Sequence, residues 1–172
     1  MAKRDLRTYL KDLDKEQLEE QILDLYGRFK QVKEFYDFAF DPKEHKMVEE
    51  AKMKVSNEYF PLKRKRPRKR RSIAQDHIRH FIQLGVDPNV TADLMLYNME
   101  VAQSFSKQNY IGSEGFYRSI LNSFGQAMKF IRENGLTKEF MPRCKAIAVQ
   151  AEAQGWFNSD VFHMTVLIPE RD

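Results

Sequence analysis

The chain has 172 residues, of which 42% are hydrophobic and 31% are charged. This length suffices for a domain with its own core, and this composition excludes a disordered protein. The formal net charge at pH 7 is +4, but residues 63–71 alone hold eight of the 29 lysines and arginines, leaving 21 against 25 acidic residues. Outside that segment the chain is net negative, unlike a protein that spreads positive charge over a face to coat nucleic acid.

The single cysteine and the hydropathy pattern indicate a cellular location. Cys144 is the one cysteine, so the chain cannot form a disulfide within itself. We therefore expect a reducing compartment. The first residues lack the apolar stretch of a signal peptide, and no window approaches the roughly 18 apolar residues of a membrane span. We expect a cytoplasmic protein with no membrane span.

Hydrophobic residues at intervals of three and four predict helices through almost the whole chain. Apolar stripes over residues 6–13 and 18–35 predict the first two helices. Asp14, with Gln17 three residues later, has the pattern of a capping box at the start of the second. Because charged residues fill the opposite faces, we expect each of these helices to pack on one side.

The next three helices have clear start and stop signals. Asp41-Pro42 and Asp87-Pro88 predict the starts of the third and fifth helices, because aspartate caps well and proline fits the first helical position. Ser72 is the expected cap of the fourth helix, which Gly85 should end in a left-handed conformation.

The C-terminal part predicts a sixth helix over residues 116–133 that ends at Asn134-Gly135. Thr137 then caps a short turn, and the main seventh helix begins near Met141, because Pro142 fits best in a first turn. Residues 161–168 are β-branched enough for a strand, but no other strand is predicted to pair with them. We therefore expect a short last helix within residues 156–172.

Together these elements predict an all-α fold of seven to eight helices in a single domain over residues 1–172. Residues 81–87 resemble residues 130–137, about fifty residues later, and each segment ends one helix before the next is capped. This spacing favours antiparallel hairpins stacked as in HEAT-like arrays. An irregular bundle, with the similarity arising by chance, is the alternative.

Several short motifs are spread over nearly the whole chain. They are Leu6-x-x-Tyr9-Leu10, Ile22-Leu23-Asp24-Leu25-Tyr26, Val32-Lys33-Glu34-Phe35-Tyr36, Tyr59-Phe60-Pro61, Asp93-Leu94-Met95-Leu96-Tyr97 with Glu100, Glu133-Asn134-Gly135-Leu136 and Gly155-Trp156. These motifs resemble a family of short bacterial helical proteins catalogued as a domain of unknown function. The resemblance implies an all-α bacterial protein, and it implies no activity, because the motifs consist mostly of packing residues.

The strongest functional signal is the basic run around Pro67. Its eight cations are Lys63, Arg64, Lys65, Arg66, Arg68, Lys69, Arg70 and Arg71. Proline and mutual repulsion both disfavour a helix, so we expect an exposed basic loop over residues 62–71 between two helices.

The composition of this run indicates a polyanion as its partner. The arginines are expected to engage phosphates through bidentate hydrogen bonds, and the lysines to add long-range attraction. Nucleic acid or another polyanion is the first expected partner; an acidic protein surface, anionic lipid and no partner at all are the alternatives. The run contains no aromatic residue, which argues against specific recognition of a single strand.

Two other groups are candidate sites. A buried Asp93 or Glu100 beside Tyr97 predicts acid–base catalysis if burial raises a carboxyl pKa, and a structural hydrogen-bond network otherwise. His77 and His80 lie three residues apart, but their neighbours do not supply further ligands, so we expect no metal site and no cofactor.

Cys144 lies between Arg143 and Lys145 near a helix start, conditions that lower a thiol pKa, but no partner base is identifiable.

We therefore expect a non-catalytic interaction module that contacts a polyanion through its basic loop. The alternatives are an enzyme with an acid/tyrosine site in an interhelical groove and a purely structural or dimerising protein. The oligomeric state stays open.

Overall fold

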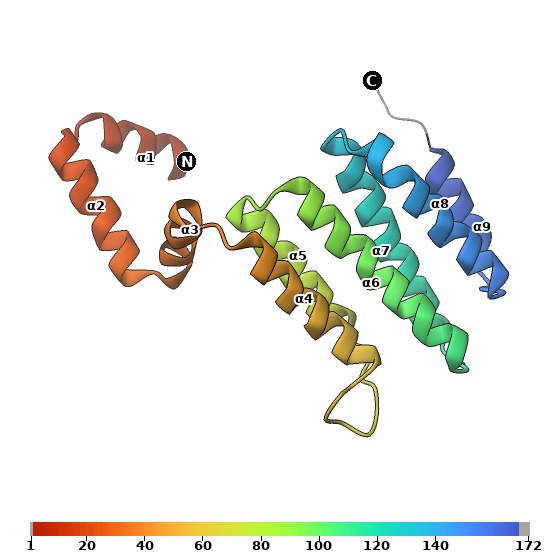
Figure 1. Ribbon diagram of the computed structural model, residues 1–172. Helices are drawn as coiled ribbons and strands as arrows, with labels where there is room; N and C mark the ends of the chain where they lie inside the picture. The colour runs from red at the N-terminus through yellow and green to blue at the C-terminus, as the bar shows by residue number, and fades with distance from the viewer. Residues whose placement is uncertain (1, 169–172) are drawn as a thin grey trace. The chain divides into compact units, whose positions relative to one another are not determined.

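The computed structural model describes residues 2–168, which form nine α-helices and no strand (Figure 1). The helices are α1 (Ala2–Lys11), α2 (Lys15–Arg28), α3 (Lys30–Phe40), α4 (Glu44–Tyr59), α5 (Arg71–Leu84), α6 (Pro88–Gln108), α7 (Glu114–Glu133), α8 (Thr137–Ala153) and α9 (Ser159–Leu167). The all-α prediction is confirmed, with nine helices in the described range rather than seven or eight. None of these helices is long and apolar enough to cross a membrane.

Contacts divide the chain into two compact units, residues 1–43 and residues 44–172. The single domain expected over residues 1–172 stays a prediction, because this division does not test whether the units fold together. The C-terminal unit, α4–α9, holds every buried side chain of residues 3–168. The N-terminal unit, α1–α3, has no buried side chain in α2 or α3.

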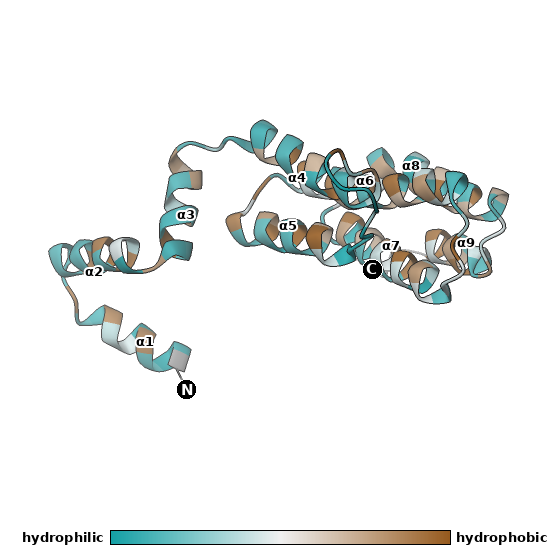
Figure 2. Ribbon diagram, turned by 90° about the horizontal axis from the view of Figure 1, so that it is seen from below, coloured by the Kyte–Doolittle hydropathy of each residue, from teal (hydrophilic) through white to brown (hydrophobic). Residues whose placement is uncertain are grey.

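The C-terminal unit is built from three helical hairpins, α4/α5, α6/α7 and α8/α9, stacked side by side. The first helices of the hairpins form one layer and the second helices form the other (Figure 2). Contacts within the first layer run in register, from Lys52–Asp93 to Tyr59–Phe105, so α4 and α6 are parallel. The predicted stack of antiparallel hairpins is therefore confirmed.

The core lies between these two layers. Each helix of the second layer contributes one fully buried phenylalanine, namely Phe81, Phe124 and Phe162. The rings of Phe124 and Phe162 lie 5.1 Å apart, so α7 and α9 are packed directly against each other. The central helix α6 contacts α4, α5, α7 and α8, and it has more buried residues than any other described helix.

The two similar segments of the sequence have the same structure. Gly85 and Gly135 both adopt a left-handed conformation, with φ of 75° and 69°. The residue after each glycine donates a backbone hydrogen bond to the carbonyl five residues earlier, over 3.1 Å at Val86 and 2.9 Å at Leu136. This is the Schellman ending, which joins one hairpin to the next in both places.

Several predicted helix boundaries were wrong. The stripe over residues 18–35 belongs to two helices, because Phe29 between α2 and α3 has an extended backbone. Asp41 lies after α3, and α4 begins only at Glu44.

The cap of α5 is Arg70 rather than Ser72. Helix α8 begins at Thr137 and continues through Pro142 without an initial turn. The capping box at Asp14 and the Asp87-Pro88 start are confirmed.

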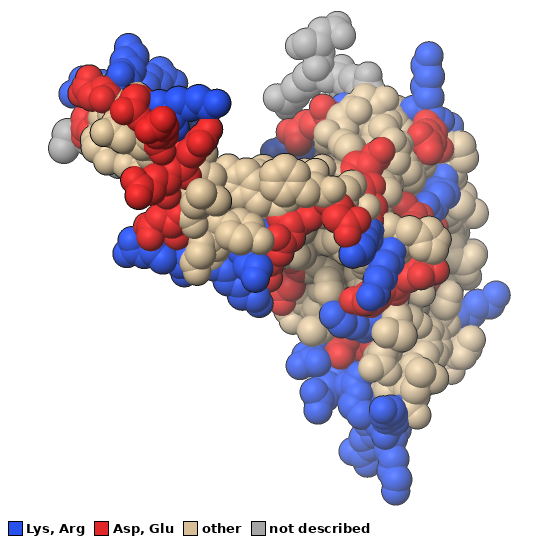
Figure 3. All heavy atoms as spheres, turned by 60° about the vertical axis from the view of Figure 1, so that its left-hand side comes forward, with Lys and Arg blue, Asp and Glu red and all other residues tan. Residues whose placement is uncertain are grey.

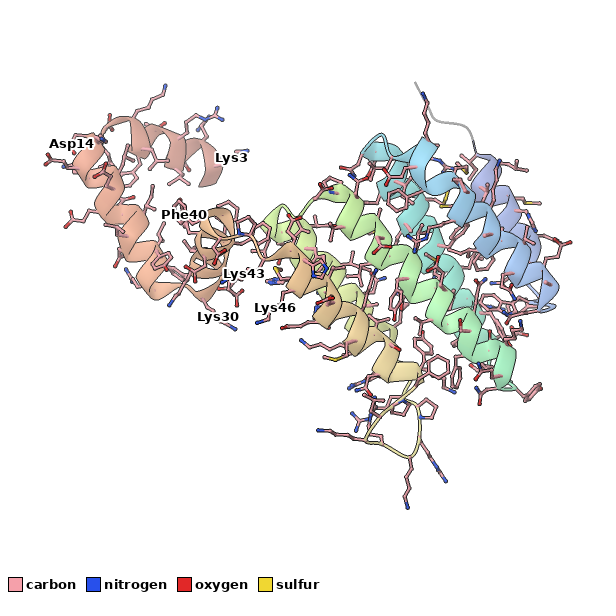
Figure 4. The ribbon with its side chains drawn as sticks, viewed as in Figure 1. Lys3, Asp14, Lys30, Phe40, Lys43 and Lys46 are labelled. Carbon is pink, nitrogen blue, oxygen red and sulfur yellow. The ribbon has the colours of Figure 1, made fainter. Side chains whose placement is uncertain are left out.

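In the N-terminal unit, the hydrophobic stripes lie largely exposed. The exposed fraction is 53% for Leu6, 43% for Ile22 and 82% for Phe40. Figure 4 labels Asp14 at the start of α2 and Phe40 at the end of α3. Helices α2 and α3 contact each other, and Tyr26 donates a 2.6 Å hydrogen bond to Asp37 between them. Helices α2 and α3 therefore pack against each other, but their hydrophobic stripes stay partly exposed.

Candidate functional site

The basic run lies in the loop between α4 and α5, residues 60–70, and ends in the first turn of α5. The loop projects from one end of the hairpin stack (Figure 1). Lysine and arginine side chains gather at that end of the surface (Figure 3). Of the predicted loop, residues 62–70 lie between the two helices and Arg71 is already helical, while Arg64 and Pro67 are half-buried.

Glu58, in the last turn of α4, anchors both ends of this loop. Its side chain is buried, with 4% exposed, and its carboxylate accepts hydrogen bonds from the guanidinium groups of Arg64 at 3.3 Å and Arg70 at 3.0 Å. Its backbone carbonyl accepts from the amides of Arg68 and Lys69, each at 3.0 Å. The hydrogen bond from Arg70 lowers the pKa of Glu58, outweighing the opposite effect of burial, and the Arg70 amide and the Arg64 charge add to it. The Glu58 carboxylate is therefore ionised, and it holds the loop in place.

Two further cations of the run bind the protein itself. Arg71 donates a 3.1 Å hydrogen bond to the backbone carbonyl of Ser119 in α7. The Lys69 ammonium lies 5.6 Å from the centre of the Phe105 ring, and the Lys69 backbone has a left-handed φ of 56°. We call Arg64, Arg70 and Arg71 the anchoring arginines, because their guanidinium groups hold the loop to the body.

The remaining four cations are Lys63, Lys65, Arg66 and Arg68, which we call the free cations. All are exposed, and their side chains form no ion pair or hydrogen bond with the described part of the chain. The start of α5 lies beside them, and its cap residue Arg70 makes no side-chain cap hydrogen bond. The amides of this first turn add positive potential near the free cations.

The acid/tyrosine group is an ion-pair network. Arg143 of α8 donates a pair of 2.9 Å hydrogen bonds to Glu100 and one of 2.7 Å to Asp93. Lys52 of α4 lies 2.5 Å from Asp93 and 5.2 Å from the centre of the Tyr97 ring. Burial raises the pKa of Asp93, but hydrogen bonds from Lys52 and Arg143 outweigh it, so the pKa is lowered. Asp93 therefore lacks the raised pKa that acid catalysis requires, and the enzyme alternative stays a prediction.

The remaining candidates show no chemistry beyond packing. Burial of Cys144 raises the pKa of its thiol to about 11 despite the neighbouring arginines, which reverses the expected lowering. His77 lines a cleft of about 390 Å³ between α4 and α5, and burial, with Lys54 and His80, lowers its pKa. Among the residues that the structure describes, no group of three potential ligands is placed to hold a metal ion.

The chain matches one known family. A family described as of unknown function (DUF6155) matches residues 1–168. The chain belongs to this family. The resemblance to an uncharacterised family is thus confirmed, while a bacterial source stays a prediction. No curated protein and no solved structure shows a significant match to the chain. Membership of DUF6155 supplies no activity, so the function has to be argued from the loop.

The sequence reasoning missed Glu58, the residue that organises the site. A signal was present, because Glu58 is the acidic residue just before a run of eight cations. No local pattern reveals the contact, because Arg70 lies twelve positions after Glu58 and meets it only when the loop folds back. The run therefore contains two sets of residues, the anchoring arginines and the free cations, rather than one uniform set.

Proposed function

We propose that this protein is a non-catalytic helical module that binds nucleic acid through the free cations. One observation carries the proposal: buried Glu58 and the anchoring arginines hold the loop in place, while four exposed cations have no partner. Like charges so close together repel one another, and a row of phosphates relieves that repulsion. Because the lone cysteine fits a reducing compartment, we propose that this binding occurs in the cytoplasm.

The anchor favours a binding role over a solvated loop. A loop that only aids solubility has no use for a buried carboxylate at its base, since burying a charge costs free energy that its partners must offset. Holding the loop in one conformation also reduces the conformational entropy lost on binding, which increases affinity. The proposed contact is electrostatic, so it should weaken steeply as salt concentration rises.

The test replaces Lys63, Lys65, Arg66 and Arg68 by serine in the full chain. We expect the native protein to bind labelled oligonucleotides at low salt, with a log–log salt slope of about −3 to −4 if each free cation engages one phosphate. The variant should lose most of this affinity and slope. Fluorescence anisotropy at several salt concentrations measures both.

The matched control replaces four cations of α1, Lys3, Arg4, Arg7 and Lys11, by serine and changes the net charge equally. It should retain the native slope. Equal losses in the two variants would indicate a general effect of charge, and the absence of binding by the native protein at low salt would also overturn the proposal. If the native protein binds an acidic protein but no oligonucleotide, the partner of the loop is an acidic protein rather than nucleic acid.

A further inference from the structure

The fold brings three loops to the same end of the hairpin stack. Because the hairpins are stacked in parallel, the turn inside each one lies at the end where the basic loop projects (Figure 1). These turns are residues 60–70 between α4 and α5, residues 109–113 between α6 and α7, and residues 154–158 between α8 and α9. Residues far apart in the sequence therefore share this end of the molecule.

Each of these turns presents an exposed aromatic ring. The exposed fraction is 37% for Phe60, 98% for Tyr110 and 56% for Phe157. Tyr110 lies across its own turn, where its ring would be 3.4 Å from a β-carbon at Gly112. A ring as exposed as that of Tyr110 contributes little to the stability of the fold, so packing does not explain why this position holds an aromatic residue.

Contacts connect the basic loop to these rings. Lys69 of the basic loop lies over the Phe105 ring, and the Phe60 ring meets the same ring edge-on at 5.8 Å. On the far side of α6, Tyr117 donates a 3.2 Å hydrogen bond to the carbonyl of Ile111 in the second turn. The ring of Tyr117 also meets that of Phe157 at 6.0 Å. Tyr117 of α7 thus connects the second turn with the third, and Phe105 of α6 lies against the basic loop.

The charges at this end differ between the turns, and the excess of cations lies in the basic loop. Lys107 is exposed in the last turn of α6, where it lines a groove with residues of α8. Arg118 lies 5.9 Å from the centre of the Phe157 ring and pairs with Glu114 at 2.9 Å. Glu152, near the end of α8, and Asp160, at the start of α9, are exposed acids beside the third turn. The positive charge of this end is therefore concentrated in the basic loop.

We propose that this end of the stack binds single-stranded nucleic acid, with phosphates on the free cations and bases stacked on Tyr110, Phe157 and Phe60. The inference rests on the proposed function and names its ligand. Neighbouring helices pack about 8–10 Å apart, so three hairpins present a platform roughly 20 Å long. In a duplex the base faces are already stacked on one another, whereas an unpaired strand offers them to aromatic side chains. The basic run lacks aromatic residues, and the other two hairpins provide them.

The test uses the full chain and a labelled oligothymidine of about 20 nucleotides, longer than typical single-strand site sizes of about 4–16 nucleotides. Tyr110→Ala and Phe157→Ala should each weaken binding by about 5-fold or more, the loss expected for one base–aromatic stack. The salt slope should not change, because no phosphate contact is removed. Tyr110→Phe and Phe157→Tyr should bind as the native protein does, since the ring is kept.

Ile82→Ala is the control, because Ile82 is 51% exposed near the C-terminal end of α5, at the opposite end of the hairpin. Duplex DNA of the same length should bind more weakly than the single strand. If both alanine variants bind the oligothymidine as the native protein does, or if the duplex binds as tightly, the single-strand inference is wrong and the proposed function still stands. If replacing the free cations has no effect, the proposed function itself is wrong.

Tyr110→Ala keeps the test independent of folding. The Tyr110 ring is almost fully exposed, so its removal should leave the unfolding transition unchanged. Phe157 touches Tyr117 and Arg118, and its variants are therefore compared by circular dichroism before binding is measured. A loss of binding by Tyr110→Ala that Tyr110→Phe does not show supports stacking.

Discussion

At the scale of single residues, Glu58 decides what the basic run can do. A carboxylate with 4% exposure is costly unless it is paired, and three groups pair it: the guanidinium groups of Arg64 and Arg70, and the Arg70 amide. Its lowered pKa means that the folded state favours the ionised form more than the unfolded chain does. The stability from this residue is therefore present above the unfolded pKa of about 4.3 and is lost as pH falls through the folded value.

Glu58→Gln keeps the size of the side chain but removes its charge. We expect it to lower the free energy of unfolding by about 1–3 kcal/mol at pH 7, because hydrogen bonds to charged groups are lost. Urea unfolding at several pH values measures this effect. The difference from the native protein should shrink as pH falls below the unfolded pKa of about 4.3, because the unfolded chain then takes up a proton more readily than the folded carboxylate does.

The control for this variant is Glu19→Gln. Glu19 pairs with Lys15 at 3.5 Å on the exposed surface of α2, where an ion pair contributes less than about 1 kcal/mol. Limited trypsin digestion provides a second measurement, since a loop released from Glu58 should be cleaved faster. Equal stability of Glu58→Gln and the native protein at pH 7 would show that Glu58 does not anchor the loop.

At the scale of elements, an ion-pair network joins the first helices of all three hairpins. Lys52 of α4 and Arg143 of α8 both bind Asp93 of α6, and Arg143 also binds Glu100 two turns further along. The bidentate geometry requires the planar fork of arginine, which lysine cannot reproduce. These residues therefore fix how α4, α6 and α8 lie side by side.

Replacing Arg143 tests this structural role. Arg143→Met should destabilise the protein by about 1–2 kcal/mol, because Glu100 loses its partner and Asp93 loses one of two. The stability of Arg143→Lys should lie between that of the native protein and that of Arg143→Met. Arg79→Met, which removes an exposed pair with Asp76, should change stability by less than about 0.5 kcal/mol in the same thermal unfolding measurement. If Arg143→Met and Arg79→Met change stability equally, the network contributes no more to stability than an exposed ion pair does.

At the scale of the whole molecule, the two units differ in how they bury apolar surface. The C-terminal unit contains every buried side chain of residues 3–168, including Phe81, Phe124 and Phe162. The N-terminal unit has amphipathic helices with exposed stripes. Burial of apolar surface is the main stabilising term in folding, so the C-terminal unit should hold most of the stability.

Residues 44–172 should therefore fold without the first unit. We expect the fragment to be helical, with a Tm within about 4 °C of the full chain, which corresponds to about 1 kcal/mol. Circular dichroism during thermal unfolding measures this. As a control, Phe124→Ala should lower stability by about 3–5 kcal/mol. An insoluble fragment, or a much larger decrease in Tm, would show that the two units form the single predicted domain.

The helices could be predicted from the sequence because their signals are local. The 3.6-residue periodicity, the capping box at Asp14 and the Asp87-Pro88 start depend on residues three or four positions apart. The split at Phe29 was missed because the hydrophobic stripe continues past it on both sides. The cap at Ser72 was wrong because Arg70, held by Glu58, sets the start of α5.

The character of the site depends on contacts between residues far apart in the chain. Arg71 reaches Ser119, Arg143 reaches Asp93, and Cys144 is buried, so its thiol pKa is raised although its flanking charges favour a lower one. No local pattern contains these contacts, because they arise only when the hairpins stack. The sequence alone therefore establishes the helices and the charge of the loop. The packing of the hairpins decides which cations are held by the body and which remain free.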